Sequence, residues 1–160
     1  MRYIGFCLVL LSTYLIIRRE RVKLDGVVGF LEELSSLLCH IECRVTSYFE
    51  SPREWAASFE AKDGEIATAL DKIKHGSAPS VALAEVLKMK KSLHGVCEDV
   101  SECISGLGGD ELCLERERIG EASERIKELA SAERARAEEV KKIRSALFVL
   151  ISLGVVIILI

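Results

Sequence analysis

The sequence predicts an all-α protein in which an antiparallel helical bundle lies between two transmembrane helices. Residues 3–17 and 145–160 are apolar runs without a charged side chain, and the segment between them is rich in Ala, Leu, Glu, Lys and Arg. The whole chain of 160 residues contains 2 prolines, a composition that favours helix throughout. The predicted organisation is a transmembrane anchor at 1–17, a cytosolic helical-bundle domain at 24–144 and a C-terminal transmembrane helix at 145–160.

Clusters of Lys and Arg flank the apolar runs on the sides that face the middle of the chain. The first run is followed, and the second preceded, by basic residues: Arg18, Arg19, Arg21 and Lys23, then Lys141, Lys142 and Arg144. Flanks rich in Lys and Arg stay on the cytoplasmic side of a membrane. Both termini are therefore predicted to lie outside the cytosol, and the middle domain inside it.

Two alternatives to a pair of spans are open. A spanning helix needs about 17–25 apolar residues, and both runs are slightly shorter. The first run could be a cleaved signal peptide, although a signal peptide carries its charge in front, where only Arg2 stands here. Both runs could be buried core helices, but the remaining chain would then have to cover two helices that are apolar all round.

The first helix of the bundle is predicted to end near Tyr48. Its apolar residues recur every three or four positions and so form one stripe: Val27, Phe30, Leu31, Leu34, Leu38, Ile41 and Val45. Glu42 falls near that stripe. Because a partly buried carboxylate needs a partner, Glu42 is predicted to pair with a Lys or Arg side chain.

A second and a third helix are predicted next. Ser51-Pro52-Arg53-Glu54 combines a capping serine, a proline at the first helical position and a glutamate that can close a capping box, so a helix begins there. Trp55, Ala56 and Phe59 are its expected buried residues. The third helix covers residues 63–74, and His75-Gly76 ends it.

The fourth predicted helix begins between Ser77 and Pro79, with Val81, Ala84, Leu87 and Lys91 along it. The fifth covers residues 93–105. The glycines at 106, 108 and 109 then mark a loop. This loop is too short for a phosphate-binding loop and lacks the Lys-Ser/Thr pair that follows one, so a nucleotide site is not predicted.

A single long helix is predicted to follow the loop. Asp110 can cap it, and from Glu111 to Ile160 it would extend over about 75 Å at 1.5 Å per residue. Residues 131–142 are rich in Glu, Arg, Lys and Ala. This stretch is interpreted as a solvated stalk held by local charge pairs such as Glu138 with Lys142.

The sequence contains no motif for catalysis, so the chain is predicted not to be an enzyme and to need no cofactor, metal or small-molecule substrate. The middle segment holds all 25 acidic residues and all but one of the 22 basic ones, which argues against a nucleic-acid partner. Cys39 and Cys43 lie four apart on one helix face and could share a metal, but two more ligands would be needed. They are interpreted as packing residues, and a membrane-anchored metal- or redox-sensing regulator that uses Cys39 and Cys43 is the alternative function.

Four segments carry a family resemblance when they are taken in order. They are Arg-Arg-Glu-Arg at 18–21, Tyr-Phe-Glu-Ser-Pro at 48–52, Leu-Gly-Gly-Asp at 107–110 and Lys-Ile-Arg-Ser-Ala-Leu at 142–147. Their order and spacing, over the length of the chain, resemble the stage III sporulation protein AB family. Two departures occur: the family's glutamate three residues before the tyrosine is Val45 here, with Glu42 as its nearest substitute, and Gly154 is the one glycine in the last span.

The resemblance implies a soluble domain similar to the cytoplasmic domain of the type II secretion F protein. It implies a structural role, as a non-enzymatic inner-membrane platform component of the channel between mother cell and forespore. The expected partners are a cytosolic secretion-type ATPase, other membrane proteins of the channel and the lipid bilayer, with homo-oligomers an open question. The expected location is the mother-cell membrane around the forespore.

The position of the docking surface is predicted from the layout of the helices. The membrane fixes the end of the bundle where the first helix begins and the last helix ends, so the loops near 48–55 and 106–110 lie at the opposite end. Loops on a rigid scaffold commonly carry function. The predicted partner-binding residues are charged: Glu50, Arg53, Asp110 and Glu111.

Overall fold

The computed structural model describes residues 2–48, 51–90, 93, 95–105, 107 and 112–159, with the side chains of 11–45, 51–90, 93, 95–105, 107, 115–151, 153 and 154. Over these residues the protein is all-helical, which confirms the predicted fold class at the level of a helical bundle. The helices in chain order are α1 (Arg2–Tyr48), α2 (Pro52–Ser58), α3 (Gly64–Lys74), α4 (Pro79–Met89), α5 (Cys97–Ile104) and α6 (Leu112–Leu159).

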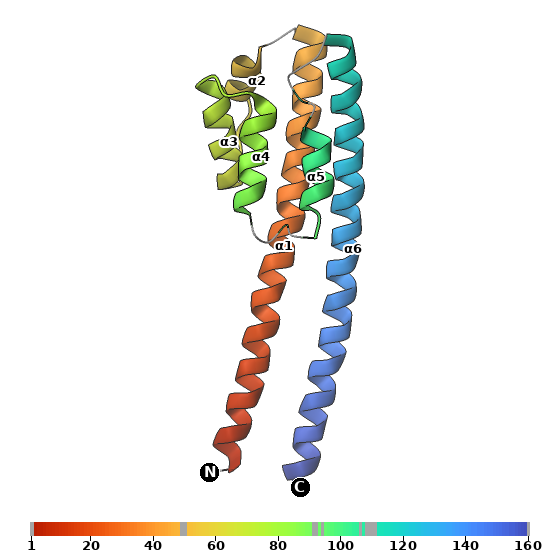
Figure 1. The fold of residues 1–160 in the computed structure, drawn as a ribbon. Helices are drawn as coiled ribbons and strands as arrows, with labels where there is room; N and C mark the ends of the chain where they lie inside the picture. Colours follow the sequence, from red (N-terminus) through yellow and green to blue (C-terminus); the bar gives the residue numbers. More distant parts are fainter. Residues whose placement is uncertain are drawn as a thin grey trace.

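The two long helices α1 and α6 form an antiparallel hairpin, with the N- and C-termini at the same end (Figure 1). The four short helices cover the half of the hairpin that is farther from the termini. We call this covered half, residues 27–130, the head, and the bare half, residues 11–26 and 131–154, the stalk. Each long helix runs without interruption from stalk to head, so the first apolar run and the first bundle helix belong to one helix.

One hydrophobic core fills the head. The predicted apolar stripe of α1 is confirmed, because all seven of its residues are buried. They pack in one cluster with buried side chains of the other helices, among them Ile66, Leu83, Val100, Ile119 and Ile126. Burying a large apolar side chain contributes about 1.5–3 kcal/mol, so this cluster is what holds the short helices on the hairpin.

The start of α2 follows the predicted capping pattern. The Glu54 carboxylate accepts hydrogen bonds from the backbone N–H and the hydroxyl of Ser51, at 2.7 and 2.8 Å. These two hydrogen bonds lower the pKa of Glu54. Trp55 and Ala56 are buried and Phe59 is partly buried, as expected.

The C-terminal end of α3 also follows prediction. His75 ends the helix, and Gly76 has a φ of 102°, the left-handed conformation that glycine adopts most readily. A side chain at position 76 would also collide with Arg53, because the guanidinium Nη2 lies 2.8 Å from where a Cβ would be. The first turn of α2 and the end of α3 therefore lie close together.

Two details of the predicted helices are wrong. Val81 is 54% exposed rather than buried, and the inner side of α4 is formed instead by Pro79, Ala82, Leu83, Val86 and Leu87. The fifth helix begins at Cys97 rather than at residue 93, because the chain before it makes two turns: Leu93 N–H donates to the Lys90 carbonyl, and Val96 N–H to the Leu93 carbonyl.

The two apolar runs are only partly described, since the side chains of 3–10 and 155–160 lie outside the described set. Among the described residues, no helix contains a stretch that is both long and apolar enough to cross a membrane.

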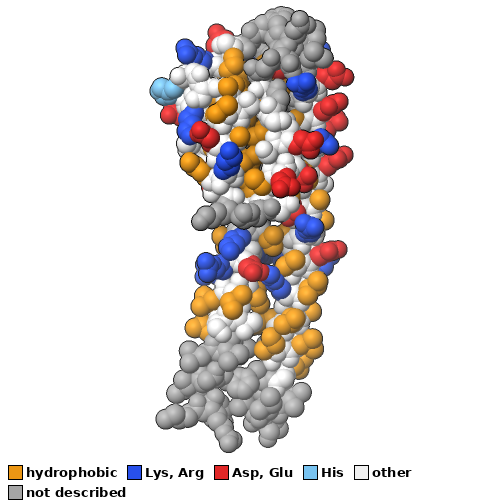
Figure 2. Space-filling model, in the orientation of Figure 1, with side chains coloured by type: hydrophobic (Ala, Val, Ile, Leu, Met, Phe, Trp, Pro, Cys, Tyr) orange, Lys and Arg blue, Asp and Glu red, His pale blue; other side chains and the backbone are white. Residues whose placement is uncertain are grey.

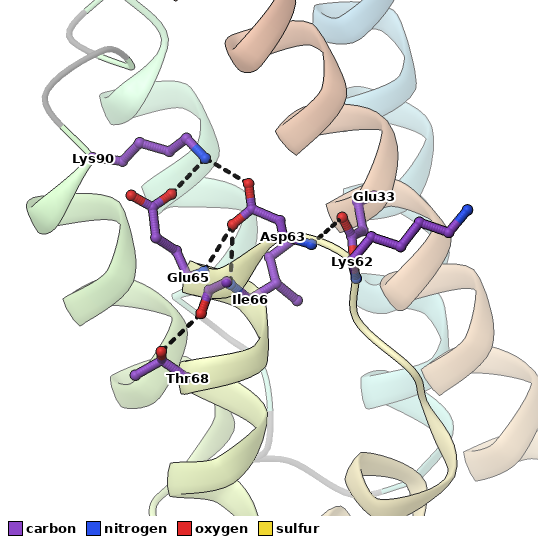
Figure 3. Close-up of polar contacts among 8 residues, drawn as sticks. Glu33, Lys62, Asp63, Glu65, Ile66, Thr68 and Lys90 are labelled. Carbon is purple, nitrogen blue, oxygen red and sulfur yellow. Dashed lines mark hydrogen bonds and ion pairs between the residues drawn. The ribbon is translucent and has the colours of Figure 1, made fainter.

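A polar cluster fastens α3 and α4 to α1 at the end of the head nearest the stalk (Figure 3). Glu33 of α1 accepts hydrogen bonds from the backbone N–H groups of Lys62 and Asp63, at 2.5 and 2.9 Å. Asp63 caps α3 through the N–H groups of Glu65 and Ile66. Lys90, just after α4, donates to Asp63 at 2.8 Å and forms an ion pair with Glu65.

The charges in this cluster stabilise one another. Burial alone would raise the pKa of Asp63, but the hydrogen bond from Lys90 and those from the backbone outweigh it and lower the pKa. Burial alone would lower the pKa of Lys90, but Asp63 and Glu65 raise it. The Lys90 ammonium also lies 4.2 Å from the centre of the Phe30 ring, a cation–π contact with α1.

Asp63→Asn should lower the free energy of unfolding at pH 7 by about 1–2 kcal/mol, because asparagine keeps the cap but loses the charged hydrogen bond to Lys90. A lowered folded-state pKa stabilises the fold above the unfolded-state pKa of about 3.9, and this contribution is lost as the pH falls through the folded-state value. The difference between wild type and variant in urea unfolding should therefore shrink below about pH 4. Glu60→Gln, at an exposed carboxylate, is the control, and a difference that stays the same at pH 3 would contradict the assignment.

Candidate functional site: the apolar end and basic collar of the hairpin

Two ion pairs join α1 to α6, one in the stalk and one where the stalk meets the head. Arg144 pairs with Glu20, and Arg134 Nη2 lies 3.1 Å from Glu32 Oε1. Ion pairs this exposed contribute about 0–1 kcal/mol each, so they mark the register more than they stabilise it. Residue 20 of α1 therefore lies level with residue 144 of α6. The predicted pair of Glu138 with Lys142 is absent among the described side chains, but a local pair of the predicted kind is present, because Arg136 pairs with Glu133 on α6 at 2.9 Å. The stalk therefore has charge pairs both along α6 and across the hairpin.

This register brings the two clusters of Lys and Arg to one level, just below the head (Figure 2). We call these residues the basic collar: Arg18, Arg19, Arg21, Lys23, Lys141, Lys142 and Arg144. All of them are exposed except Arg144, which is half-buried. The two clusters are more than 100 positions apart in the sequence, and the fold brings them to the same level along the hairpin.

Large apolar side chains are exposed on both helices on the side of the collar that faces the termini. This apolar end comprises Leu11, Tyr14, Leu15, Ile16, Leu147, Phe148, Val149, Leu150 and Leu153. Most of these side chains are more than half exposed, with Leu150 at 68%. Contiguous exposed apolar surface of this kind marks a site of contact with lipid or with another protein.

A groove of about 630 Å³ runs along the hairpin between α1 and α6, from the apolar end past the collar to the base of the head. The described residues that line it all belong to the two long helices. They recur every three or four positions on each helix, as in Tyr14, Ile17 and Arg21 on α1, so the groove follows one face of each. A second hollow of about 440 Å³ continues it along Ser35 and Lys127.

The helix ends that border the predicted docking loops, Tyr48 of α1 and Leu112 of α6, lie at the other end of the molecule (Figure 1). Arg53 is the one predicted docking residue that is described, and it is exposed beside Gly76. Glu50, Asp110 and Glu111 lie outside the described residues. Their predicted role in partner binding stays a prediction.

The four cysteines whose side chains the structure describes lie on two different parts of the head. Cys39 and Cys43 are exposed on α1, whereas Cys97 and Cys103 of α5 pack against the core, where burial raises the pKa of the Cys103 thiol. In the part of the chain that the structure describes, no group of three or more His, Cys, Asp or Glu side chains is placed to hold a metal ion.

His40, between the two α1 cysteines in sequence, contacts α2 instead. Its Nε2 lies 2.9 Å from the Ser58 hydroxyl, and its ring packs edge-on against Phe59 with the centroids 5.3 Å apart. The regulator that uses Cys39 and Cys43 stays an untested alternative.

Glu42 is half-buried between the two long helices. Its carboxylate faces Gly120 of α6, with Oε1 3.5 Å from where a Cβ would be, an ordinary contact distance. The predicted Lys or Arg partner of Glu42 stays a prediction.

Sequence reasoning found the basic clusters and the apolar runs but missed the groove and the two ion pairs across the hairpin. One signal was available: Glu20 is the one acidic residue within the first basic cluster, and a lone charge of opposite sign there can mark a contact with another segment. Comparison with protein-family models, with curated proteins and with solved structures gave no match to this chain. The resemblance to the stage III sporulation protein AB family therefore stays a prediction.

Proposed function

We propose that this protein is a non-enzymatic, membrane-anchored platform component. The apolar end enters the bilayer, the basic collar lies at its cytosolic surface, and the head extends into the cytosol, where it docks another protein. One observation carries the proposal: on both helices, exposed apolar side chains give way to Lys and Arg at the same level. That is the pattern that a bilayer and its charged cytoplasmic surface require.

The charges support the orientation of this arrangement. Cytoplasmic leaflets are negatively charged, and each Lys or Arg near such a surface contributes about 1 kcal/mol of attraction. The seven cations of the collar therefore favour the surface of the bilayer, while the acidic side chains of the head stay clear of it. The described apolar side chains would then face lipid, which removes the cost of exposing them to water.

By its resemblance to the stage III sporulation protein AB family, the partner would be a secretion-type ATPase of the channel between mother cell and forespore. The head offers its far end for that contact, about 40 Å from the collar if the 27 residues between Arg21 and Tyr48 each rise 1.5 Å. Arg53 lies there, exposed in the first turn of α2, with its guanidinium beside Gly76.

The proposed docking is tested by charge reversal at the two ends of the molecule. Arg53→Glu and Glu111→Lys should each weaken binding of a secretion-type ATPase by about tenfold in co-purification from membranes, because like charges then meet across the interface. Lys142→Glu, in the collar, is the control and should leave ATPase binding unchanged. Unchanged binding in both far-end variants, with loss only in the collar variant, would move the docking site to the stalk.

A further inference from the structure

The charged and apolar side chains of the groove are arranged in layers along its length. Nearest the termini the groove is lined by Tyr14, Ile17 and Phe148. The next layer holds Arg21, Lys141 and Arg144, and the layer beyond it, towards the head, holds Asp25 and Glu138. Asp25 follows Arg21 by four residues and Glu138 precedes Lys141 by three, so on each helix the anionic layer lies about one turn above the cationic one.

Four of these charges are available to a ligand. Arg144 is paired with Glu20, and higher in the groove Arg134 is paired with Glu32. By contrast, Arg21, Asp25, Glu138 and Lys141 are exposed, and among the described side chains none of them forms an ion pair. The groove thus presents two free cations next to its apolar end and two free carboxylates one turn farther from it.

We propose that this groove binds phosphatidylethanolamine, with an acyl chain along Tyr14, Ile17 and Phe148, the phosphate at Arg21 and Lys141, and the ammonium at Asp25 and Glu138. The inference rests on the proposed membrane insertion, which brings the groove to the level of the lipid headgroups. The order of apolar, cationic and anionic layers is the order of acyl chain, phosphate and ammonium in this lipid. Basic pockets between helices on the cytoplasmic side of a membrane are established headgroup sites.

The carboxylates decide between lipid classes. Arg and Lys bind the phosphate of any phospholipid through charged hydrogen bonds. Phosphatidylglycerol carries no cation for Asp25 and Glu138, so its net negative charge meets two carboxylates. The quaternary ammonium of phosphatidylcholine cannot donate a hydrogen bond, whereas the primary ammonium of phosphatidylethanolamine donates three, as a lysine does.

The experiment uses the full chain, purified in a neutral detergent, and native mass spectrometry with the three lipids bearing identical acyl chains. Wild type should retain phosphatidylethanolamine about tenfold more tightly than the other two, a difference of about 1.4 kcal/mol. Asp25→Asn with Glu138→Gln should abolish that preference without weakening phosphatidylglycerol binding. Arg21→Gln with Lys141→Gln should weaken all three lipids. Arg19→Gln with Lys142→Gln removes the same charge from the collar at positions that do not line the groove, and should keep the preference.

Several outcomes would overturn the site. Equal retention of the three lipids by wild type would contradict the proposed selection of phosphatidylethanolamine by Asp25 and Glu138. If the Arg21/Lys141 variant and the Arg19/Lys142 control lose lipid binding equally, the lipids are held by general attraction to the collar and not by the groove. A lipid-free dimer, dissociated by the groove variants alone, would make a second copy of the chain the occupant. Circular dichroism confirms that each variant is folded, and the single variants Glu138→Gln and Lys141→Gln replace any double variant that is not.

Alkaline extraction of wild-type membranes separates this proposal from the one on which it rests. If the protein is released into solution, the proposed membrane insertion fails. If the protein stays in the membrane but shows no preference among the lipids, the groove site alone fails.

Discussion

Leu11→Lys together with Leu153→Lys should move the protein from the membrane fraction to the soluble fraction. Both side chains belong to the apolar end and are more than half exposed, at 56% and 54%, so the substitutions leave the packing of the head untouched. A lysine deep in a bilayer costs about 2.5–3.5 kcal/mol, and two of them shift the partition by more than a thousandfold. The measurement is alkaline extraction followed by sedimentation, with circular dichroism to confirm that the variant is folded.

A matched control exists in the same two helices. Val22 and Ile143 are also exposed apolar residues, at 66% and 63%, but they lie at the level of the collar. Val22→Lys with Ile143→Lys adds the same two charges where the proposed membrane surface lies, so the control should stay in the membrane fraction. If both double variants behave alike, the position of the charge does not matter and the proposed depth is wrong.

Phe30→Ala should lower the free energy of unfolding by about 3–5 kcal/mol, the usual cost of removing a buried phenyl ring from a packed core. Phe30 is 2% exposed, contacts the core cluster and lies under the Lys90 ammonium. Chemical unfolding followed by circular dichroism measures the change. Met89→Ala, at a side chain that is 67% exposed, should change the free energy by less than about 0.5 kcal/mol.

A small effect of Phe30→Ala would contradict the described packing of the head. It would mean that α3 and α4 are held on α1 by the polar cluster of Glu33, Asp63 and Lys90 rather than by apolar contacts. Comparing Phe30→Ala with Asp63→Asn therefore ranks the two sources of stability directly.

Much of the fold could be predicted from local sequence patterns, namely the spacing of apolar residues and the residues that cap helices. The three- and four-residue spacing of Val27, Phe30 and Leu34 predicts which side of α1 is buried, and Ser51 with Pro52 predicts where α2 begins. These predictions succeed because helix periodicity and capping depend on neighbours within one or two turns.

The predictions are wrong where contacts between residues far apart in the sequence determine which side chains are buried or where a helix begins. Val81 is as apolar as the buried residues of α4, and only the packing of α4 on its neighbours leaves it exposed. Leu93 reaches the core from the chain before α5, which its spacing from Val96 does not reveal. A short helix has few apolar residues whose spacing can show which side is buried, so the predicted buried side can be wrong by one residue.

In the candidate site, too, the features that depend on local sequence could be predicted and those that depend on distant contacts could not. The basic clusters and apolar runs were visible in the sequence, because charge and hydropathy change sharply at Arg18 and Lys142. The groove and its layers depend on the register between α1 and α6, which is marked by the ion pairs of Glu20 and Glu32 with partners more than 100 residues away. No local pattern contains that information.

The central claim, that the apolar end lies in lipid with the collar at its surface, is tested most directly by the depth of single labelled residues. Spin labels would be placed at Leu15 and Leu150 in the apolar end and at Val22 and Ile143 in the collar, each in a cysteine-free chain reconstituted into vesicles. The account predicts that the labels at 15 and 150 are reached by oxygen and protected from a water-soluble nickel complex, while those at 22 and 143 are open to the nickel complex. Equal access of the nickel complex to all four labels would contradict it.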